Sequence, residues 1–202
     1  MAGTQAGQQR HAFVGVRGGA APRPRQPNQG LTLIEILATL TILSALLTLA
    51  IPSFARLIAD WQVSSAVNRF HGHLRWARQE SMRQSTPVSM CSGNADGCRT
   101  ARLALDWSSG WIVFTDRNGN GQLDLEDELL AQESAPAGLQ AVTASTTQTL
   151  TFRPNGLLSR GRMSRFAWTS SLRHKGKPHA QRLVCINATG RARTLKDTEK
   201  CA

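Results

Sequence analysis

The longest apolar run of the chain covers residues 31–51 and contains one charged side chain, Glu35. About 20 apolar residues are enough to cross a bilayer as a helix, so the pattern predicts a transmembrane helix over 31–51. Residues 1–30 are rich in Gly, Gln, Pro and Arg and have no acidic residue. This composition cannot bury enough surface to fold, and its arginines predict that the N-terminus stays in the cytoplasm.

A helical period continues after the apolar run. Apolar residues recur three and four positions apart, at Phe54, Leu57, Ile58, Trp61, Val67, Phe70, Leu74 and Ala77. Pro87 prevents the helix from continuing, so we expect an amphipathic helix over 52–85. Its stripe is expected to pack on a globular head, and the alternative is a surface that binds a partner.

Residues 86–202 are predicted to form a β-rich head. Short β-branched or aromatic runs, "VSMC", "GWIVFTD", "TLTFRPNG" and "QRLVCINATG", are bounded by Gly, Asn and Pro. The strongest turn signals are "PNG" at 154–156 and "NGNG" at 118–121. The pattern therefore predicts an α+β fold, with one long helix packed on an antiparallel sheet or small sandwich.

Four cysteines allow three disulfide connectivities. The local pairing joins Cys91 to Cys98 and Cys185 to Cys201, and each of these bridges closes a loop that has no other evident anchor. Disulfides persist in oxidising compartments, which agrees with a head on the far side of the membrane.

The segment "DRNGNGQLDLED" has the spacing of a calcium-binding loop. Its candidate ligands are Asp116, Asn118, Asn120, Gly121, Asp124 and Asp127. However, the last position is Asp rather than Glu, and strand patterns rather than helices flank the loop. We favour a β-hairpin turn over a metal site, and expect no cofactor.

Charge is distributed unevenly along the chain. Residues 86–152 carry a net charge of −5, whereas residues 153–202 carry twelve Lys/Arg against two Asp/Glu. Such a basic block is typical of a site for a polyanion. One cluster contains Arg153, Arg160, Arg162, Arg165, Arg173, Lys175 and Lys177, and a second contains Gly190, Arg191, Arg193 and Lys196. The alternative is a face that is merely solvated or meets the acidic middle of another subunit.

The junction "G-LTLIE" resembles the processing site of type IV prepilins and type II secretion pseudopilins. The resemblance implies cleavage after Gly30 by a prepilin peptidase and N-methylation of Leu31, although the usual first residue is Phe. It also implies that Glu35 serves filament assembly and that Pro52 bends the helix. A carboxylate in hydrocarbon is costly without a partner, and the new amine of a neighbouring subunit's Leu31 could supply one. A plain signal anchor, with Glu35 reaching the membrane surface, is the alternative.

The cysteine pattern, "GWIVFTDRNGNG" and the final "GRAR" resemble the GspH/FimT group of minor pilins and pseudopilins. The resemblance implies a type IV pilin-like fold, a single pass through the inner membrane, a periplasmic head and other pilins as partners. In FimT-type pilins a Gly-Arg-x-Arg motif is associated with DNA capture, which carries that role to Gly190, Arg191 and Arg193. A glycine at position 190 would let the backbone approach the ligand closely. We therefore expect a minor pilin that assembles into or primes the filament and binds DNA non-specifically at the filament tip. The alternative is an H-type pseudopilin of type II secretion.

No pattern of residues predicts an enzyme. His71 and His73 are two positions apart on a helix and should point in different directions. His174 and His179 lie in the basic segment, away from any cysteine or carboxylate in the sequence. A nucleophile motif and a glycine-rich phosphate loop before a helix are both missing from the sequence.

Overall fold

The computed structural model describes residues 30–100, 105–145, 149–160, 163–196 and 201. The predicted leader, apart from Gly30, therefore lies outside the described residues, as does Arg162 of the basic region. The chain divides into two compact units, Met1–Ile42 and Leu43–Ala202.

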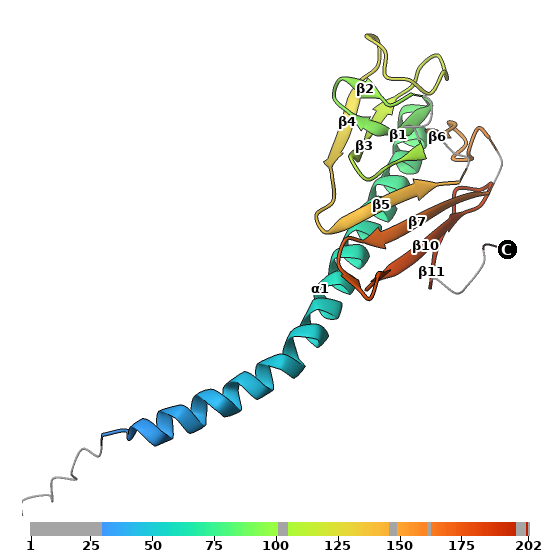
Figure 1. Cartoon of the computed structure of the whole chain (residues 1–202). Coiled ribbons are helices and arrows are strands. Elements are labelled where there is room, and N and C mark those ends of the chain that lie inside the picture. The colour runs from blue at the N-terminus through green and yellow to red at the C-terminus, as the bar shows by residue number, and fades with distance from the viewer. Residues whose placement is uncertain (1–29, 101–104, 146–148, 161–162, 197–200, 202) are drawn as a thin grey trace, which may run out of the picture. The chain divides into compact units, whose positions relative to one another are not determined.

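A long helix, α1 (Leu33–Gln84), contributes residues to both units (Figure 1). At its start the Glu35 N–H donates to the Thr32 hydroxyl, an interaction typical of a helix N-cap. At its end Ser85 adopts a positive φ of 51°, a conformation that commonly terminates helices. The predicted end near Ser85 is confirmed, and the backbone of Pro52 lies within the helix.

The described side chains between Leu31 and Ile51 are all exposed. Among the described helices, none alone is long and apolar enough to cross a membrane. A bend divides α1 into two helical parts, Leu33–Thr48 and Ser53–Gln84, and these meet that requirement only when they are taken together.

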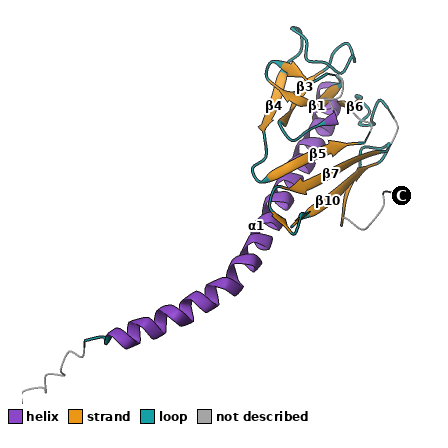
Figure 2. Ribbon diagram, viewed as in Figure 1, coloured by secondary structure: helices purple, strands orange, loops and turns teal. Residues whose placement is uncertain are grey.

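Two antiparallel sheets form most of the head (Figure 2). The first sheet contains β1 (Val88–Asn94), β2 (Gly97–Cys98), β3 (Gly110–Thr115), β4 (Leu129–Ser134) and β6 (Thr149–Phe152). The second has the order β11 (Ala192–Lys196), β10 (Gln181–Ile186), β7 (Ser164–Ser170), β5 (Leu139–Ala144). A separate hairpin pairs β8 (Arg173–His174) with β9 (Lys177–Pro178). The expected combination of one helix with antiparallel sheets is confirmed.

The predicted strand runs correspond to β1, β3, β6 and β10, whereas β4, β5 and β7 were not predicted. Strand β7 does carry a signal, because its residues alternate between buried and exposed along "SRFAWTS". No residue of strand β4 is fully buried, and its sequence lacks the apolar alternation that identifies a half-buried strand.

The core of the head is centred on Phe70 of α1. Its ring makes edge-on contacts with Trp107, Trp111 and Trp168, at centroid distances of 5.9, 5.6 and 5.3 Å. All four side chains are completely buried. These residues come from α1, from two strands in different sheets and from the segment before β3, so one aromatic cluster ties the helix to both sheets.

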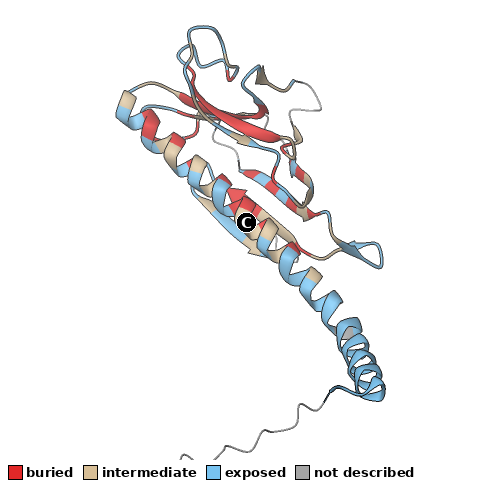
Figure 3. Ribbon diagram, turned by 90° about the vertical axis from the view of Figure 1, so that its left-hand side faces the viewer, coloured by how far each residue is buried: buried red, intermediate tan, exposed pale blue. Residues whose placement is uncertain are grey.

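The predicted apolar stripe of the helix is only half correct. Val67, Phe70, Leu74 and Ala77 are buried as expected. Phe54, Leu57, Ile58 and Trp61 are exposed instead, Phe54 by 64% and Trp61 by 70%. The buried face begins at Ala59 and continues through Val63 and Ala66 (Figure 3). Small side chains at these positions allow strands to approach closely, and no described part of the head buries the large residues before them.

Both predicted disulfides are present. Cys91–Cys98 joins β1 to β2, and Cys185–Cys201 joins β10 to the C-terminal end of the chain. The local connectivity is therefore confirmed.

Candidate nucleic-acid interface

A tight turn over residues 187–191 connects β10 to β11 and carries the Gly190-Arg191 pair. The Gly190 N–H donates to the Asn187 carbonyl, and the Arg191 N–H donates to Asn187 Oδ1. Gly190 has a φ of 75°, and a Cβ at this position would lie 2.5 Å from Cε1 of Phe152. Only glycine fits such a site. Gly190 is buried, and its close approach to Phe152 fixes the position of the turn that carries Arg191.

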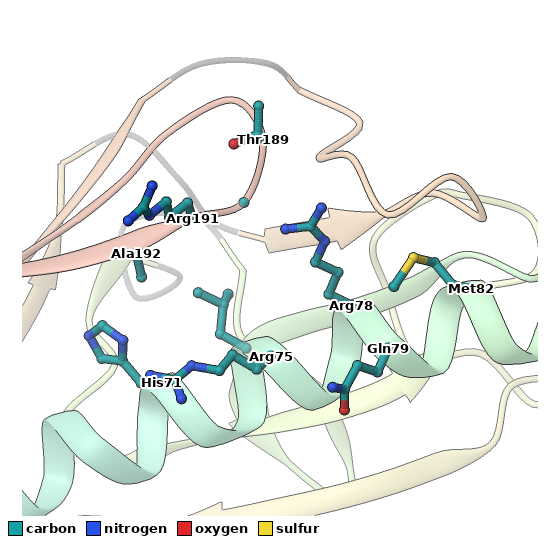
Figure 4. A pocket seen from close by; sticks show the side chains of 10 residues that line it. His71, Arg75, Arg78, Gln79, Met82, Thr189, Arg191 and Ala192 are labelled. Atoms are coloured by element: carbon teal, nitrogen blue, oxygen red, sulfur yellow. The ribbon is translucent and has the colours of Figure 1, made fainter.

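A cavity of about 650 Å³ lies between this turn and α1 (Figure 4). Its lining combines basic, polar and apolar side chains: His71, Leu74, Arg75, Arg78, Gln79, Met82, Thr189, Gly190, Arg191 and Ala192. The helix forms one wall, and the turn with the start of β11 forms the other. Residues more than 100 positions apart in the sequence thus meet at one site.

The arginines of the cavity have no acidic partner among the described residues. Elsewhere in that part of the chain Arg69, Arg83 and Arg182 pair with Glu133, Glu80 and Asp60. Arg75, Arg78 and Arg191 form no such ion pair there, and the cavity lining contains no Asp or Glu. Guanidinium groups that lack a carboxylate attract anions, and phosphate oxygens fit their planar fork.

Arg78 is supported by the predicted "PNG" turn. The side chain is half-buried, and a Cβ at Gly156 would lie 3.2 Å from its Nε. The same turn is attached to α1, because the Ser81 hydroxyl donates to the Arg153 carbonyl at 3.1 Å. The "PNG" turn therefore lies close to the part of α1 that carries Arg78.

His71 does not add a charge to the cavity at neutral pH. Burial, and then the nearby Arg75 cation, lower the pKa of the imidazole below its usual value of 6.5. Its Nε2 forms a hydrogen bond with the Thr194 hydroxyl at 3.0 Å, which links α1 to β11. The anion-attracting charge therefore comes from the three arginines.

The remaining predicted basic residues divide into separate groups. Arg165 of β7 and Arg193 of β11 both lie opposite Cys185 of β10, so they share one face of the second sheet. Thr194 contacts α1, and neighbouring strand residues alternate in direction. Arg193 therefore points away from the helix, and of the two GRAR arginines only Arg191 lines the cavity.

The other predicted basic residues do not line the cavity. Lys196 is on the helix-facing side, in register with Arg182. Lys175 and Lys177 belong to the β8–β9 hairpin, which connects the far end of β7 to β10, on the order of 15 Å from the Cys185 row at strand spacing. Arg160 is exposed between β6 and β7. The structure thus does not unite the two sequence clusters into one surface.

Arg75 and Arg78 were not among the predicted site residues. The sequence does contain a signal for them, because His71, Arg75 and Arg78 are four and three positions apart and so share a helix face. Nothing in the sequence indicates that the 187–191 turn covers that face.

The 116–127 segment connects β3 to β4, which pair in antiparallel fashion, so the hairpin interpretation is confirmed. Asp127 accepts backbone N–H groups from Arg117 and Asp124, and Asp124 accepts the side-chain amides of Asn118 and Asn120. Buried Asp116 accepts the Ser89 hydroxyl and the Gly121 N–H. Within the described residues, no group of three His, Cys, Asp or Glu side chains is arranged to hold a metal ion.

The two helix histidines point to different strands, as expected. His73 Nδ1 accepts the indole N–H of Trp111 in β3 at 2.8 Å, whereas His71 contacts Thr194 in β11. His174 and His179 stack on each other beside the β8–β9 hairpin.

A long helix packed on antiparallel sheets, preceded by a processing motif, defines the class of type IV pilin-like proteins. Residues 25–51 match the prokaryotic N-terminal methylation motif. Residues 66–190 match the family described as type II transport protein GspH. This second match covers more than half of the chain, and the chain belongs to the GspH family.

Two crystal structures of the type IV minor pilin FimU from Pseudomonas aeruginosa PAO1 are similar to this chain. The sequence identities are 20% and 22%, and the TM-scores are 0.48 and 0.47. The similarity covers 68% and 67% of this chain, and 90% and 94% of the FimU chains. No curated protein matches the sequence.

Family membership makes this chain a minor pilin or pseudopilin of a type IV pilus or type II secretion system. Such proteins are membrane-anchored, are processed by a prepilin peptidase and assemble with other pilins. The family consists of structural proteins rather than enzymes.

Proposed function

We propose that this protein is a minor pilin of a type IV pilus that binds DNA without sequence preference. Cleavage after Gly30 would leave Leu31 as the methylated N-terminus of a helix that crosses the inner membrane. The head would then lie in the periplasm or on the assembled filament. The observation that carries the DNA-binding proposal is the cavity in which Arg191 meets two further arginines, none of them paired with a carboxylate among the described residues.

Phosphate is the ligand chemistry that these residues favour. DNA offers a dense row of phosphate charges, and contacts to them carry no sequence information. The exposed Arg165 and Arg193 on the outer face of the second sheet extend the positive surface beyond the cavity. A net charge of +10 over residues 153–202 strengthens attraction over longer distances.

Assembly into the filament would use the N-terminal part of α1. Phe54, Leu57 and Trp61 are exposed and apolar, which suits contacts with the helices of neighbouring pilins. Glu35 would pair with the new terminal amine of an adjacent subunit, because an ionised carboxylate in the membrane needs a partner.

The second candidate is an H-type pseudopilin with a structural role in protein export. The description of the matching family, a type II transport protein, favours it. In that case the basic region would meet the acidic residues 86–152 of another subunit. DNA binding by the purified protein distinguishes the two functions.

The test is the salt dependence of DNA binding by the mature chain in detergent, measured by fluorescence anisotropy with a labelled duplex. We expect the logarithm of the affinity to fall linearly with the logarithm of salt concentration, with a slope of about −0.9 for each phosphate contacted. Replacing Arg191 and Arg193 by alanine should abolish retention of DNA at moderate salt.

Thermal unfolding monitored by tryptophan fluorescence serves as the control, since both arginines are exposed and their loss should not unfold the head. Unchanged affinity in the folded double variant would reject the assignment of these two arginines. No binding by the unmodified chain at low salt would favour the pseudopilin.

A further inference from the structure

One face of α1 and the 187–191 turn present their cations to the same space. Arg75 and Arg78 lie on the helix wall of the cavity, and Arg191 lies on the opposite wall. In Figure 4 the Arg78 side chain rises from the helix toward the opposite wall, while Arg75 lies along the helix toward His71. Arginines from two segments far apart in the sequence therefore line one cavity.

The charge of the cavity is uncompensated among the described residues. Its lining holds three guanidinium groups and no carboxylate, and the lowered pKa of His71 keeps the imidazole neutral at pH 7. Holding three like charges around one space is unfavourable unless an anion or solvent offsets them. A bound phosphate would accept hydrogen bonds from more than one of them.

The shape and the remaining lining residues suit a nucleic-acid backbone. A volume of about 650 Å³ is within the range of sites that take small organic groups, and exceeds the need of a single inorganic ion. Met82 lines the cavity beside the arginines, and because it is exposed it offers apolar contact to a sugar ring. Gln79 and Thr189 add polar side chains that can donate hydrogen bonds to phosphate oxygens.

We propose that this cavity is a cleft for the sugar-phosphate backbone of DNA, in which Arg75 and Arg78 of the helix act together with Arg191. This inference rests on the proposed DNA-binding function and adds the two helix residues to it. The site then depends on the position of the 187–191 turn against α1, which the close approach of Gly190 to Phe152 and the His71–Thr194 hydrogen bond maintain. It is not a property of a basic tail alone.

The experiment compares two double variants of the mature chain that each remove two positive charges. Arg75→Gln with Arg78→Gln removes the helix wall of the cleft. Lys175→Gln with Lys177→Gln removes two exposed lysines at the far end of the second sheet. Binding of a labelled duplex is measured over a range of salt concentrations in detergent.

We expect the helix variant to bind at least about tenfold more weakly at low salt. The magnitude of the slope of log affinity against log salt concentration should fall by about 2, because each lost phosphate contact removes about 0.9. The lysine variant should retain the slope. Equal losses in both variants, or no loss in the helix variant, would overturn the inference. Failure of the unmodified chain to bind DNA would instead reject the proposed function.

Two further measurements do not depend on how the double variant folds. Arg78→Lys keeps the charge but loses the guanidinium fork, so its affinity should lie between that of the unmodified chain and that of Arg78→Gln. Modification of arginines by phenylglyoxal, mapped by mass spectrometry on the unmodified chain, should be slowed at Arg75 and Arg78 by bound DNA. Equal modification with and without saturating DNA would contradict the cleft.

Membrane lipids offer similar phosphodiester chemistry. Mixed detergent micelles that contain phosphatidylglycerol are therefore included in the modification experiment as a separate arm. DNA binding at the cleft predicts protection of Arg75 and Arg78 by DNA in the presence of these micelles. Protection by the phosphatidylglycerol micelles alone would overturn the assignment to DNA.

Discussion

Gly190 is a residue at which backbone conformation and packing impose the same requirement. Its positive φ disfavours any L-side chain, and the ring of Phe152 occupies the space where a Cβ would lie. Gly176 in the β8–β9 hairpin has a similar φ of 77°, but open space surrounds its Cβ position. Comparing substitutions at Gly190 and Gly176 therefore separates the cost of backbone strain from the cost of steric overlap.

We predict that Gly190→Ala lowers the free energy of unfolding by about 2–5 kcal/mol, because strain and overpacking add. Gly176→Ala should cost only about 1–2 kcal/mol, from the left-handed conformation alone. Urea unfolding followed by tryptophan fluorescence measures both. Equal costs for the two variants would show that contact with Phe152 does not restrict Gly190.

Sequence alone indicates Gly190 through the "GRAR" motif, but suggests that it lets the backbone approach a ligand. The structure gives a different reason for glycine, because the residue faces Phe152 inside the head. A motif can thus identify an important position correctly while the physical cause lies in a contact with a distant strand.

At the scale of single elements, the last turn of α1 contains a buried carboxylate. Glu80 is 7% exposed and accepts hydrogen bonds from the side chains of Arg83 and Gln84. These bonds lower the pKa of Glu80 from 4.5 to about 2. The charged form therefore stabilises the folded helix end.

A lowered carboxyl pKa predicts how stability depends on pH. The contribution of Glu80 to the free energy of unfolding should be complete above about pH 4.5, and it should be lost as the pH falls toward 2. Glu80→Gln should therefore reduce stability at neutral pH and flatten the loss of stability between pH 4.5 and 2. Urea unfolding at several pH values tests this, with exposed Glu126→Gln as the control. An identical acid profile for Glu80→Gln and the unmodified chain would contradict the prediction.

The boundaries of α1 illustrate which element features are local. Pro87 and the polar residues before it predict the helix end, and the end is observed at Gln84. The buried face could not be assigned in the same way, because periodicity cannot reveal where the head begins to cover the helix. Trp61 continues the apolar period but is exposed, whereas Ala59 is buried.

For the whole molecule, the N-terminal apolar run carries one carboxylate, that of Glu35. Glu35 lies in the first turn of α1, where a negative charge interacts favourably with the helix dipole. That interaction alone does not explain a carboxylate within a membrane-length apolar run, and the proposed partner is the terminal amine of a neighbouring subunit.

We predict that Glu35→Ala leaves cleavage after Gly30 intact but strongly reduces incorporation into filaments, because the new amine loses its acidic partner. Mass spectrometry of the purified chain measures cleavage and N-methylation, and immunoblotting of sheared filaments measures incorporation. Glu126→Ala, which removes an exposed carboxylate from the head, is the matched control. Normal incorporation of Glu35→Ala would contradict the pairing.

By itself the sequence determined the features that depend on neighbouring residues. These are the apolar run with its processing junction, the end of the helix before Pro87, the hairpin at 116–127 and the local disulfide pairing. Each follows from composition, spacing or backbone preference within a short segment, so no knowledge of distant contacts is needed.

Only the tertiary structure decided which faces meet. It separated the buried part of the apolar stripe from Phe54 and Trp61, and it brought Arg75 and Arg78 opposite Arg191 while leaving Lys175 and Lys177 elsewhere. The physical reason is that these outcomes depend on how the sheets pack around Phe70. Packing of that kind is set by shape complementarity among side chains far apart in the chain.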